Sequence, residues 1–501
     1  MLKCKLWLQS FLDDSGTKSS RAWVVLLIFT LALLIFSVLG LNLSGRDSPR
    51  VAGIAREMAV TSDYLIPRLN GEDFLEYPSS GYWPIAFTLS MSENPPDFLA
   101  FLPMALLGAG TVLITYLIGK KLAGERIGLM AGFILSTMPA FITYHRHFRV
   151  DPALLFFITL SLYGFVASYQ ASWEKPLFSG LFYLGMAGAF LSKGIIGAAI
   201  PLGTGAVFLI IKKDLKAIRK LFLRPEVFLF LLPVLLWVVG VWRLEGPEVI
   251  KEVMRQSLFR FLSPSADHAK PFYYYFTRVF VAPLPWTLLF VVLLWYRWGP
   301  TQSREPLLHG PLLKFALGWS LIIFVGLSLS SAKRTLYLGP IYPPFALLAA
   351  LGWDRIREKF PKVKRSEAYA LIVVFLVYVA VYLFAITPME RKESLRPVFK
   401  MVSSQQSNGT IYLVNPSETT RGASFFYLGK RIPLLNGQDV LSGRFDHRPG
   451  TILLIDSYTG DNQLFSALQS KGYRLLLQRK YGKTVGVYAY SNGSSGDDGH
   501  Q

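Results

Sequence analysis

The sequence is short of cysteine, of charge and of the common cofactor motifs. Cys4 is the only cysteine, so no internal disulfide can form, and charged residues make up 17% of the 501 residues, against about 25% in a typical soluble domain. The chain has no P-loop, no dinucleotide fingerprint, no Gly-x-Ser-x-Gly motif and no His-Glu-x-x-His motif. Nothing in the sequence therefore indicates that the chain binds a nucleotide or uses ATP.

The sequence is rich in apolar residues. Hydrophobic residues make up 52% of the chain, and the mean hydropathy is +0.38. Repeated apolar runs of about 18 residues or more are typical of membrane-spanning helices. The 37 Phe, 24 Tyr and 11 Trp often lie near the ends of these runs, as aromatic belts at membrane interfaces do. The composition therefore indicates an integral membrane protein and excludes a soluble globular domain.

The formal net charge is +20, and its distribution argues against nucleic-acid binding. The densest basic runs lie in short loops between apolar segments, at residues 120–126, 212–224 and 355–365. Loops of this kind set topology by remaining in the cytoplasm, and they contact anionic lipid head groups. We therefore expect membrane lipids, and no nucleic acid, as partners of these residues.

About eleven spans can be assigned by alternation. Residues 1–22 form a cytoplasmic N-terminus, and no small-residue cleavage site follows the first apolar run, which we interpret as an uncleaved helix. The long polar outer loop 43–97 comes next, and the predicted transmembrane domain extends over residues 23–388. The predicted spans lie near 23–41, 98–119, 126–142, 152–170, 177–192, 194–211, 227–243, 275–295, 311–329, 335–352 and 367–386.

The segment 389–490 is too polar to span a membrane. Four short runs rich in β-branched and aromatic residues, beginning at 410, 451, 473 and 485, predict strands, and residues 462–471 predict a helix. We therefore expect a small C-terminal α/β domain, placed outside the cytoplasm by the count of spans. Residues 491–501 are rich in Ser, Gly and Asp and predict a disordered tail.

The first outer loop carries two acids of interest, Asp47 and Glu76. A carboxylate that takes a proton from an acceptor hydroxyl must lie within hydrogen-bond reach of it. Asp47 or Ser48 could equally cap a helix, because Pro49 is favoured at the first helical position. Both interpretations stay open, and they are compatible. Residues 49–60 have the spacing of an amphipathic helix, which we expect to lie on the outer membrane surface.

Other polar residues gather in the outer loops. Arg149 and Asp151 precede the fourth span, whereas the pair His145-x-His147 lacks a third ligand, so we predict no metal site there. Lys333 and Arg334 precede the tenth span, on the side that the positive-inside bias leaves poor in cations. They could snorkel to the interface, but fixed cations also stabilise the charge that grows on a leaving lipid phosphate.

These motifs, taken in order, resemble those of the aminoarabinose lipid A transferases, which are C-type membrane glycosyltransferases related to protein O-mannosyltransferases. In the first loop the resemblance runs from Gly45-Arg46-Asp47-Ser48-Pro49-Arg50 to Leu75-Glu76-Tyr77-Pro78 and Gly81-Tyr82-Trp83. It covers most of residues 23–352 and continues through Arg149-x-Asp151, Phe190-Leu-Ser-Lys193-Gly194, His268-x-Lys270-Pro271, Leu284-Pro-Trp286, Lys333-Arg334-x-x-Tyr337 and Tyr342-Pro343.

The resemblance implies an all-α polytopic membrane protein of about 11–13 transmembrane helices with the C-type glycosyltransferase fold and a small extracytoplasmic α/β domain. It also implies a multi-pass protein of the bacterial inner membrane, with its active site on the periplasmic side. Asp47, Asp151 and Glu76 match the family's acidic positions, so we assign them as catalytic. We assign donor-phosphate binding to Lys193, Lys270, Lys333, Arg334 and Tyr337. Acceptor or sugar binding is assigned to Arg46, Arg50, Tyr77, Tyr82, Arg149, His268 and Tyr342.

Two positions depart from the family pattern. Ser48 follows Asp47 where the family usually has a second acid, and Tyr77 replaces the Lys of the family's Glu-Lys-Pro, which is thought to hold the donor phosphate. The expected function is inverting transfer of a sugar from an undecaprenyl-phosphate donor to a lipid A-like glycolipid or another extracytoplasmic acceptor. The alternatives are a protein O-glycosyltransferase of the same fold and a transporter or flippase for lipid-linked sugars. No cofactor is predicted, and the use of a divalent cation is left open.

Overall fold

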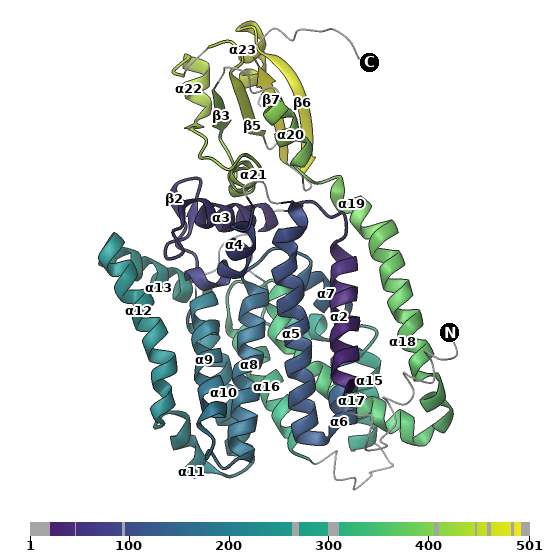
Figure 1. Ribbon diagram of the computed structural model, residues 1–501. Coiled ribbons are helices and arrows are strands. Elements are labelled where there is room, and N and C mark those ends of the chain that lie inside the picture. The colour runs from purple at the N-terminus through teal and green to yellow at the C-terminus, as the bar shows by residue number, and fades with distance from the viewer. Residues whose placement is uncertain are drawn as a thin grey trace.

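The computed structural model describes residues 21–45, 47–92, 96–262, 270–298, 310–404, 410–445, 448–457, 462–481 and 485–491. A tall bundle of helices forms one layer, and a smaller domain of strands and helices is seated on one end of it (Figure 1). Most of the predicted tail and most of the predicted cytoplasmic N-terminus lie outside the described residues, as do Arg46 and His268.

Each predicted span coincides with a helix or a broken pair of helices. Among the described residues, six helices are long and apolar enough to cross a membrane, and there are seven if the pair α6–α7, which bends by 64°, is taken as one span. Shorter apolar helices, among them α2 and α10, complete the bundle. The bundle helices are α2 (Ala22–Val38), α5 (Asp97–Ala123), α6 (Glu125–Ser136), α7 (Pro139–His145), α8 (Asp151–Gln170), α9 (Pro176–Lys193), α10 (Ile195–Ile211), α12 (Phe228–Glu245), α14 (Tyr274–Val281), α15 (Thr287–Trp298), α16 (Pro311–Leu329), α17 (Tyr342–Lys359) and α18 (Pro361–Val381).

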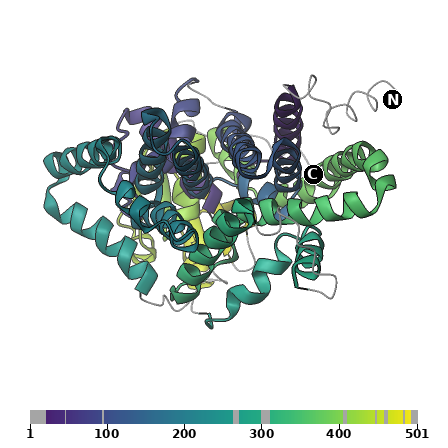
Figure 2. The ribbon, with the colours of Figure 1, turned by 90° about the horizontal axis from the view of Figure 1, so that it is seen from below.

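The centre of the bundle is formed by α5, α6, α8, α9 and α17, and α12 and α18 lie at its opposite edges (Figure 2). Only 11% of the most apolar window of each edge helix is buried, so both present apolar side chains outward, as lipid-facing helices do. Gly194 has φ +72 and separates α9 from α10, because a residue without Cβ can make this sharp reversal. The helices α9 and α10 therefore form a tight hairpin.

Further helical elements connect the bundle helices. They are α11 (Leu215–Ile218), η3 (Arg219–Leu221), η4 (Pro225–Val227), α13 (Pro247–Leu262), η6 (Thr335–Ile341), η7 (Tyr382–Ile386) and α19 (Thr387–Arg391). Arg146 is fully buried beside this last connection, where it binds the carbonyl of Ser37 and pairs with Glu390 at 2.9 Å. Arg146 therefore fastens α7 to α2 and α19.

The first loop folds into its own layer on the end of the bundle. It contains α3 (Asp47–Thr61), a hairpin of β1 (Arg68–Leu69) with β2 (Glu72–Asp73), η2 (Ser79–Gly81) and α4 (Trp83–Leu89). The predicted helix at 49–60 is present, but its expected place on the membrane surface is wrong. Residues 51–58 are all buried, because α4 packs against one side of α3 and the C-terminal domain against another.

The C-terminal domain is a five-stranded sheet of order β4-β3-β5-β7-β6. Its strands β3 (Ile411–Val414), β5 (Ile452–Ser457), β6 (Arg474–Tyr481) and β7 (Val485–Ser491) match the four predicted strands, while β4 (Leu434–Leu435) was not predicted. The strand β3 pairs in parallel with β4 and β5, and β7 pairs antiparallel with β5 and β6. The helices are α20 (Arg396–Ser404), α21 (Glu418–Leu428), α22 (Gly437–Ser442) and α23 (Asn462–Ser470). The predicted fold class is thus confirmed.

Candidate functional site

The candidate site lies where three helix ends meet beneath the first-loop layer. Asp47 is the first residue of α3, Asp151 is the first residue of α8, and Lys193 is the last residue of α9. A carboxylate at a helix N-terminus and a cation at a helix C-terminus are both stabilised by the helix dipole. The segment that links α16 to α17 brings Arg334 and Tyr337 to the same place.

Asp47 is surrounded by three arginines from different parts of the chain. Its carboxylate lies 3.3 Å from Arg50, 3.6 Å from Arg149 and 4.0 Å from Arg334. Burial alone would raise the pKa of this carboxyl, but the arginines outweigh burial and lower its pKa below the usual value of 3.8. Asp47 is therefore ionised at neutral pH, and it stands at the centre of a positively charged cluster.

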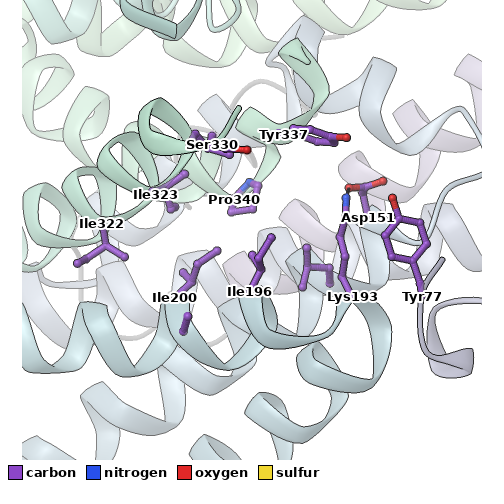
Figure 3. A pocket seen from close by; sticks show the side chains of 14 residues that line it. Tyr77, Asp151, Lys193, Ile196, Ile200, Ile322, Ile323, Ser330, Tyr337 and Pro340 are labelled. Atoms are coloured by element: carbon purple, nitrogen blue, oxygen red, sulfur yellow. Dashed lines mark hydrogen bonds and ion pairs between the residues drawn. The ribbon is translucent and has the colours of Figure 1, made fainter. Parts of the chain in front are cut away.

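Lys193 forms a second group with Asp151 and two aromatic rings. Its ammonium binds the Asp151 carboxylate directly, and it lies over the rings of Tyr77 at 5.4 Å and of Tyr337 at 4.8 Å. The ammonium, the carboxylate and the Tyr77 ring meet at one end of the pocket in Figure 3. A cation held between aromatic faces loses less by desolvation, so Lys193 stays charged in a half-apolar setting.

A cavity of about 240 Å³ leads away from Lys193. One end carries Tyr77, Asp151, Lys193 and Tyr337, whereas the opposite end is lined by isoleucines, as Figure 3 shows. The apolar lining comes from α10 and α16 and comprises Ile196, Ala199, Ile200, Ile322, Ile323, Gly326 and Leu327. The cavity therefore joins a charged head to an apolar channel between bundle helices, which is the shape an amphipathic ligand needs.

Two hydrogen-bond donors of Arg149 have no acceptor among the described residues. Its Nε and Nη1 atoms are buried and have no hydrogen-bond partner within the described ranges, although Nε lies 3.6 Å from Asp47. A buried donor without an acceptor costs about 1–3 kcal/mol, so such groups usually mark a place where a ligand or water binds. An anionic ligand group beside Arg149 would satisfy both atoms.

Arg50 connects the cluster to two further acids. It lies 3.9 Å from Glu76 of the first loop and 2.7 Å from Glu418, the first residue of α21. Its guanidinium also stacks over Phe74 at 5.4 Å. Glu418 was not predicted as a site residue, because no motif marks it and its sequence distance from Arg50 hides the contact.

The remaining predicted residues are placed less centrally. Tyr82 and Tyr342 are buried, and Tyr342 packs 6.1 Å from Tyr144. Lys333 is buried and donates to the carbonyl of Ser330, so its ammonium is engaged within its own loop. Lys270 is exposed, and no ion pair within the described ranges joins it to the cluster.

Tyr275 is a residue that sequence reasoning missed. Its hydroxyl donates to the carbonyl of Arg334 and accepts from the backbone N–H of Arg334, both at 3.1 Å. These two bonds fix the backbone from which the Arg334 side chain reaches Asp47. The run Tyr273-Tyr274-Tyr275 was the only signal available, and it gave no partner.

The pair His145-x-His147 lies at the end of α7. In the part of the chain that the structure describes, no three His, Cys, Asp or Glu side chains cluster in a way that could hold a metal ion. His145 is buried and lies 2.9 Å from the carbonyl of Phe141 through Nδ1. Burial and the neighbouring Arg149 and Arg146 lower the pKa of His147 to about 3, so this side chain is neutral.

The fold and the site together define a polytopic membrane protein with a cationic pocket that opens into an apolar channel. Residues 50–244 match the family described as dolichyl-phosphate-mannose-protein mannosyltransferase. The chain is 26% identical over 369 residues to an undecaprenyl phosphate-alpha-4-amino-4-deoxy-L-arabinose arabinosyl transferase of Edwardsiella ictaluri, over 72% of this chain and 65% of the relative. It is 28% identical over 360 residues to an uncharacterized protein of Aquifex aeolicus, over 71% and 68% of the two chains.

Solved structures agree on the fold. ArnT from Cupriavidus metallidurans, bound to undecaprenyl phosphate, superposes with a TM-score of 0.72 at 19% identity, over 95% of this chain and 99% of that chain. The Archaeoglobus fulgidus oligosaccharyltransferase in the apo form gives 0.55 at 11% identity, over 96% and 76%. The chain thus has the fold of these transferases, and its sequence is similar to those of the aminoarabinose transferases and of the protein mannosyltransferase family.

Proposed function

We propose that the protein is an inverting glycosyltransferase that moves a sugar from a polyprenyl-phosphate donor, such as an undecaprenyl-phosphate sugar, to an acceptor outside the cytoplasm. The observation that carries the proposal is one cavity in which Lys193 and Asp151 close one end and isoleucines line the other. A polyprenyl phosphate has this same division, with a dianionic or monoanionic head on a long apolar tail.

The phosphate would sit between Lys193, Arg149 and Arg334. Lys193 already faces the cavity, and the two open donors of Arg149 would gain acceptors from phosphate oxygens. The polyprenyl tail would follow Ile196, Ile200 and Ile323 toward lipid. As the bond between the sugar and the phosphate breaks, negative charge grows on the phosphate, and the fixed cations stabilise that charge.

Asp47 would act on the acceptor. Its lowered pKa keeps it ionised, so it can accept a proton from an acceptor hydroxyl, or orient that hydroxyl, while the hydroxyl attacks the anomeric carbon on the side opposite the phosphate. An acceptor that is itself a phosphate needs no base, and Asp47 would then serve to position it. Glu76 lies close enough to Arg50 to share in this positioning.

The active site would face the periplasm of a bacterial inner membrane. The basic runs at 120–126, 212–224 and 355–365 lie at helix ends and in the short connections between them, and the positive-inside bias assigns such regions to the cytoplasm. The first-loop layer and the C-terminal domain lie at one end of the bundle in Figure 1, whereas α11, within the second basic run, lies at the opposite end. This arrangement supports an acceptor that arrives from outside, such as a lipid A-like glycolipid.

The test is transfer of radiolabelled sugar from its polyprenyl-phosphate carrier to membrane acceptors by the purified protein in lipid vesicles. Asp47→Ala and Asp47→Asn should lower transfer about 10²–10⁴-fold, the usual contribution of a general base. Asp63→Asn is the matched control, because Asp63 pairs with Arg68 in the same loop layer. An Asp47 variant that transfers like the parent sinks the catalytic role, and a parent that binds the carrier without ever cleaving it favours a lipid-linked sugar transporter.

A protein acceptor is the second candidate. The match of residues 50–244 to the protein mannosyltransferase description favours it, because that region contains Asp47's neighbours Arg50 and Arg149. Offering lipid extract and membrane protein separately distinguishes the two, since label would pass to a chloroform-soluble glycolipid in one case and to protease-sensitive material in the other.

A further inference from the structure

The C-terminal domain touches the first-loop layer by a close crossing of two helices. The crossing is at Gly53 of α3 and Gly422 of α21, and a methyl group at either position would collide with the backbone of the other helix. Helices that meet through glycine backbones have little freedom to change their spacing. The position of α3, which carries Asp47 and Arg50, is therefore tied to the position of the domain.

Several polar contacts outside the arginine cluster strengthen this helix crossing. Arg421 binds the carboxylate of Glu72 in the β1–β2 hairpin, and Arg431 pairs with Glu57 at 3.0 Å. Asn70 donates to the carbonyl of Ile432 at 2.8 Å and accepts from its N–H at 2.9 Å. These contacts join the domain to the loop layer, but they do not touch the arginine cluster around Asp47.

The contact between Glu418 and Arg50 reaches from the domain into that cluster. Arg50 uses Nη1 for Glu418 at 2.7 Å and Nη2 for Asp47 at 3.3 Å, so the two carboxylates hold the two arms of one guanidinium. Ser417 caps α21 by accepting from the N–H of Thr420, which fixes the backbone from which Glu418 projects. The Glu76 carboxylate, 3.9 Å from Nη1, is the competing partner.

We propose that Glu418 is a positioning residue through which the C-terminal domain holds Arg50 against Asp47. The proposal rests on the proposed function. Without Glu418, the Nη1 arm of Arg50 is free to turn toward Glu76, and the guanidinium rotates away from Asp47. The planar guanidinium group of Arg50 keeps its orientation only while both of its terminal nitrogens are bound. The domain thus completes the charge pattern of the site without contacting donor or acceptor.

The effect on Asp47 depends on every charged group around the pair. Asp47 and Arg50 are faced by Arg149, His147, Arg334, Glu76, Tyr82 and Glu418. Arg149 and Arg334 keep Asp47 ionised at neutral pH when Arg50 moves, so the protonation of Asp47 changes only at low pH, whereas the displaced Arg50 lowers kcat at neutral pH as well. The acid limb of the rate profile then shifts to higher pH, because a carboxyl with one cation fewer takes up its proton more readily.

The experiment compares Glu418→Gln and Glu418→Asp with Glu72→Gln, which breaks the Arg421 pair in the same interface. We expect Glu418→Gln to lower kcat about two- to fivefold, because the Glu418 side chain is 52% exposed and exposed ion pairs contribute little. The donor KM should stay within about twofold, and the acid limb should move to higher pH. Glu418→Asp should restore part of kcat, and Glu72→Gln should keep the parent profile. Parent-like kinetics in Glu418→Gln, or an equal shift in Glu72→Gln, would overturn the positioning role.

Hydrogen exchange of the α3 backbone gives a second readout that needs no turnover. Exchange in the first turn of α3 should quicken in Glu418→Gln and remain at the parent rate in Glu72→Gln; unchanged exchange in both variants counts against the proposal. A parent that transfers no sugar overturns the proposed function, whereas the exchange measurement still decides the role of Glu418.

Discussion

Replacing Lys193 by Met tests the phosphate end of the cavity most directly. Met keeps the length and apolar body of the side chain but removes the charge that binds Asp151 and faces the pocket. Removing one preorganised donor from a developing anion costs about 10²–10³ in kcat, or roughly 2.7–4 kcal/mol. We therefore expect Lys193→Met to lose about that factor in the radiolabelled transfer assay and Lys193→Arg to lose less.

The same substitution leaves Asp151 as a buried carboxylate without its cation. The two side chains are only 10% and 13% exposed, and breaking a buried pair costs about 3–5 kcal/mol, an upper bound for this partly wet pair. Lys193→Met should thus melt earlier than Lys193→Met/Asp151→Asn in a fluorescence-detected thermal assay, while both stay inactive. Parent-rate transfer by Lys193→Met would refute the phosphate assignment, and recovery of transfer in the double variant would show that Lys193 serves only Asp151.

Three further outcomes follow from the same contacts. Tyr77→Ala should weaken donor use about 2–30-fold, since a cation–π contact contributes about 0.5–2 kcal/mol, and donor titration measures it. Because the pKa of Asp47 is lowered, transfer should stay active as the pH falls toward the usual range of a carboxyl group. Arg334→Met should move the acid limb to higher pH because one stabilising cation is lost, and rates measured across pH check both. Gly53→Val should prevent the domain from docking on α3 and lower the yield of monodisperse protein, whereas Gly326→Ala, at a position with open space, should not.

Most of the fold was predictable from the sequence because few structures can span a lipid bilayer. A long apolar run has few alternatives to a spanning helix, so each predicted span has its helix. The strands at 411–414, 452–457, 474–481 and 485–491 were predictable from their β-branched and aromatic residues, whereas the two-residue strand β4 gives no pattern long enough to detect. The surroundings of α3 were not predictable, because its amphipathic pattern does not reveal that Glu57 pairs with Arg431 of a distant domain.

The sequence predicted that several polar residues would lie close together, but it did not predict which of them pair. Polar residues at the ends of apolar helices had to share one face of the membrane, and Asp47, Arg149 and Arg334 are indeed brought together. Sequence alone could not separate Lys333, which bends back to the carbonyl of Ser330, from its neighbour Arg334, which reaches Asp47. Adjacent residues in an irregular segment point in different directions, and no periodicity tells which one enters a pocket.

Tyr77 departs from the pattern of the similar transferases, and the contacts of the neighbouring Lys193 compensate for the lysine that is missing at position 77. The Lys usual at this position would bring a second ammonium close to Lys193, whose ammonium lies 5.4 Å from the Tyr77 ring. Two cations that close repel unless a phosphate lies between them, whereas a tyrosine ring attracts the one cation that remains. Lys193 is then held by Tyr77, Tyr337 and Asp151 before any donor arrives, so phosphate binding would depend on Lys193 and the open donors of Arg149 and not on the loop that carries residue 77.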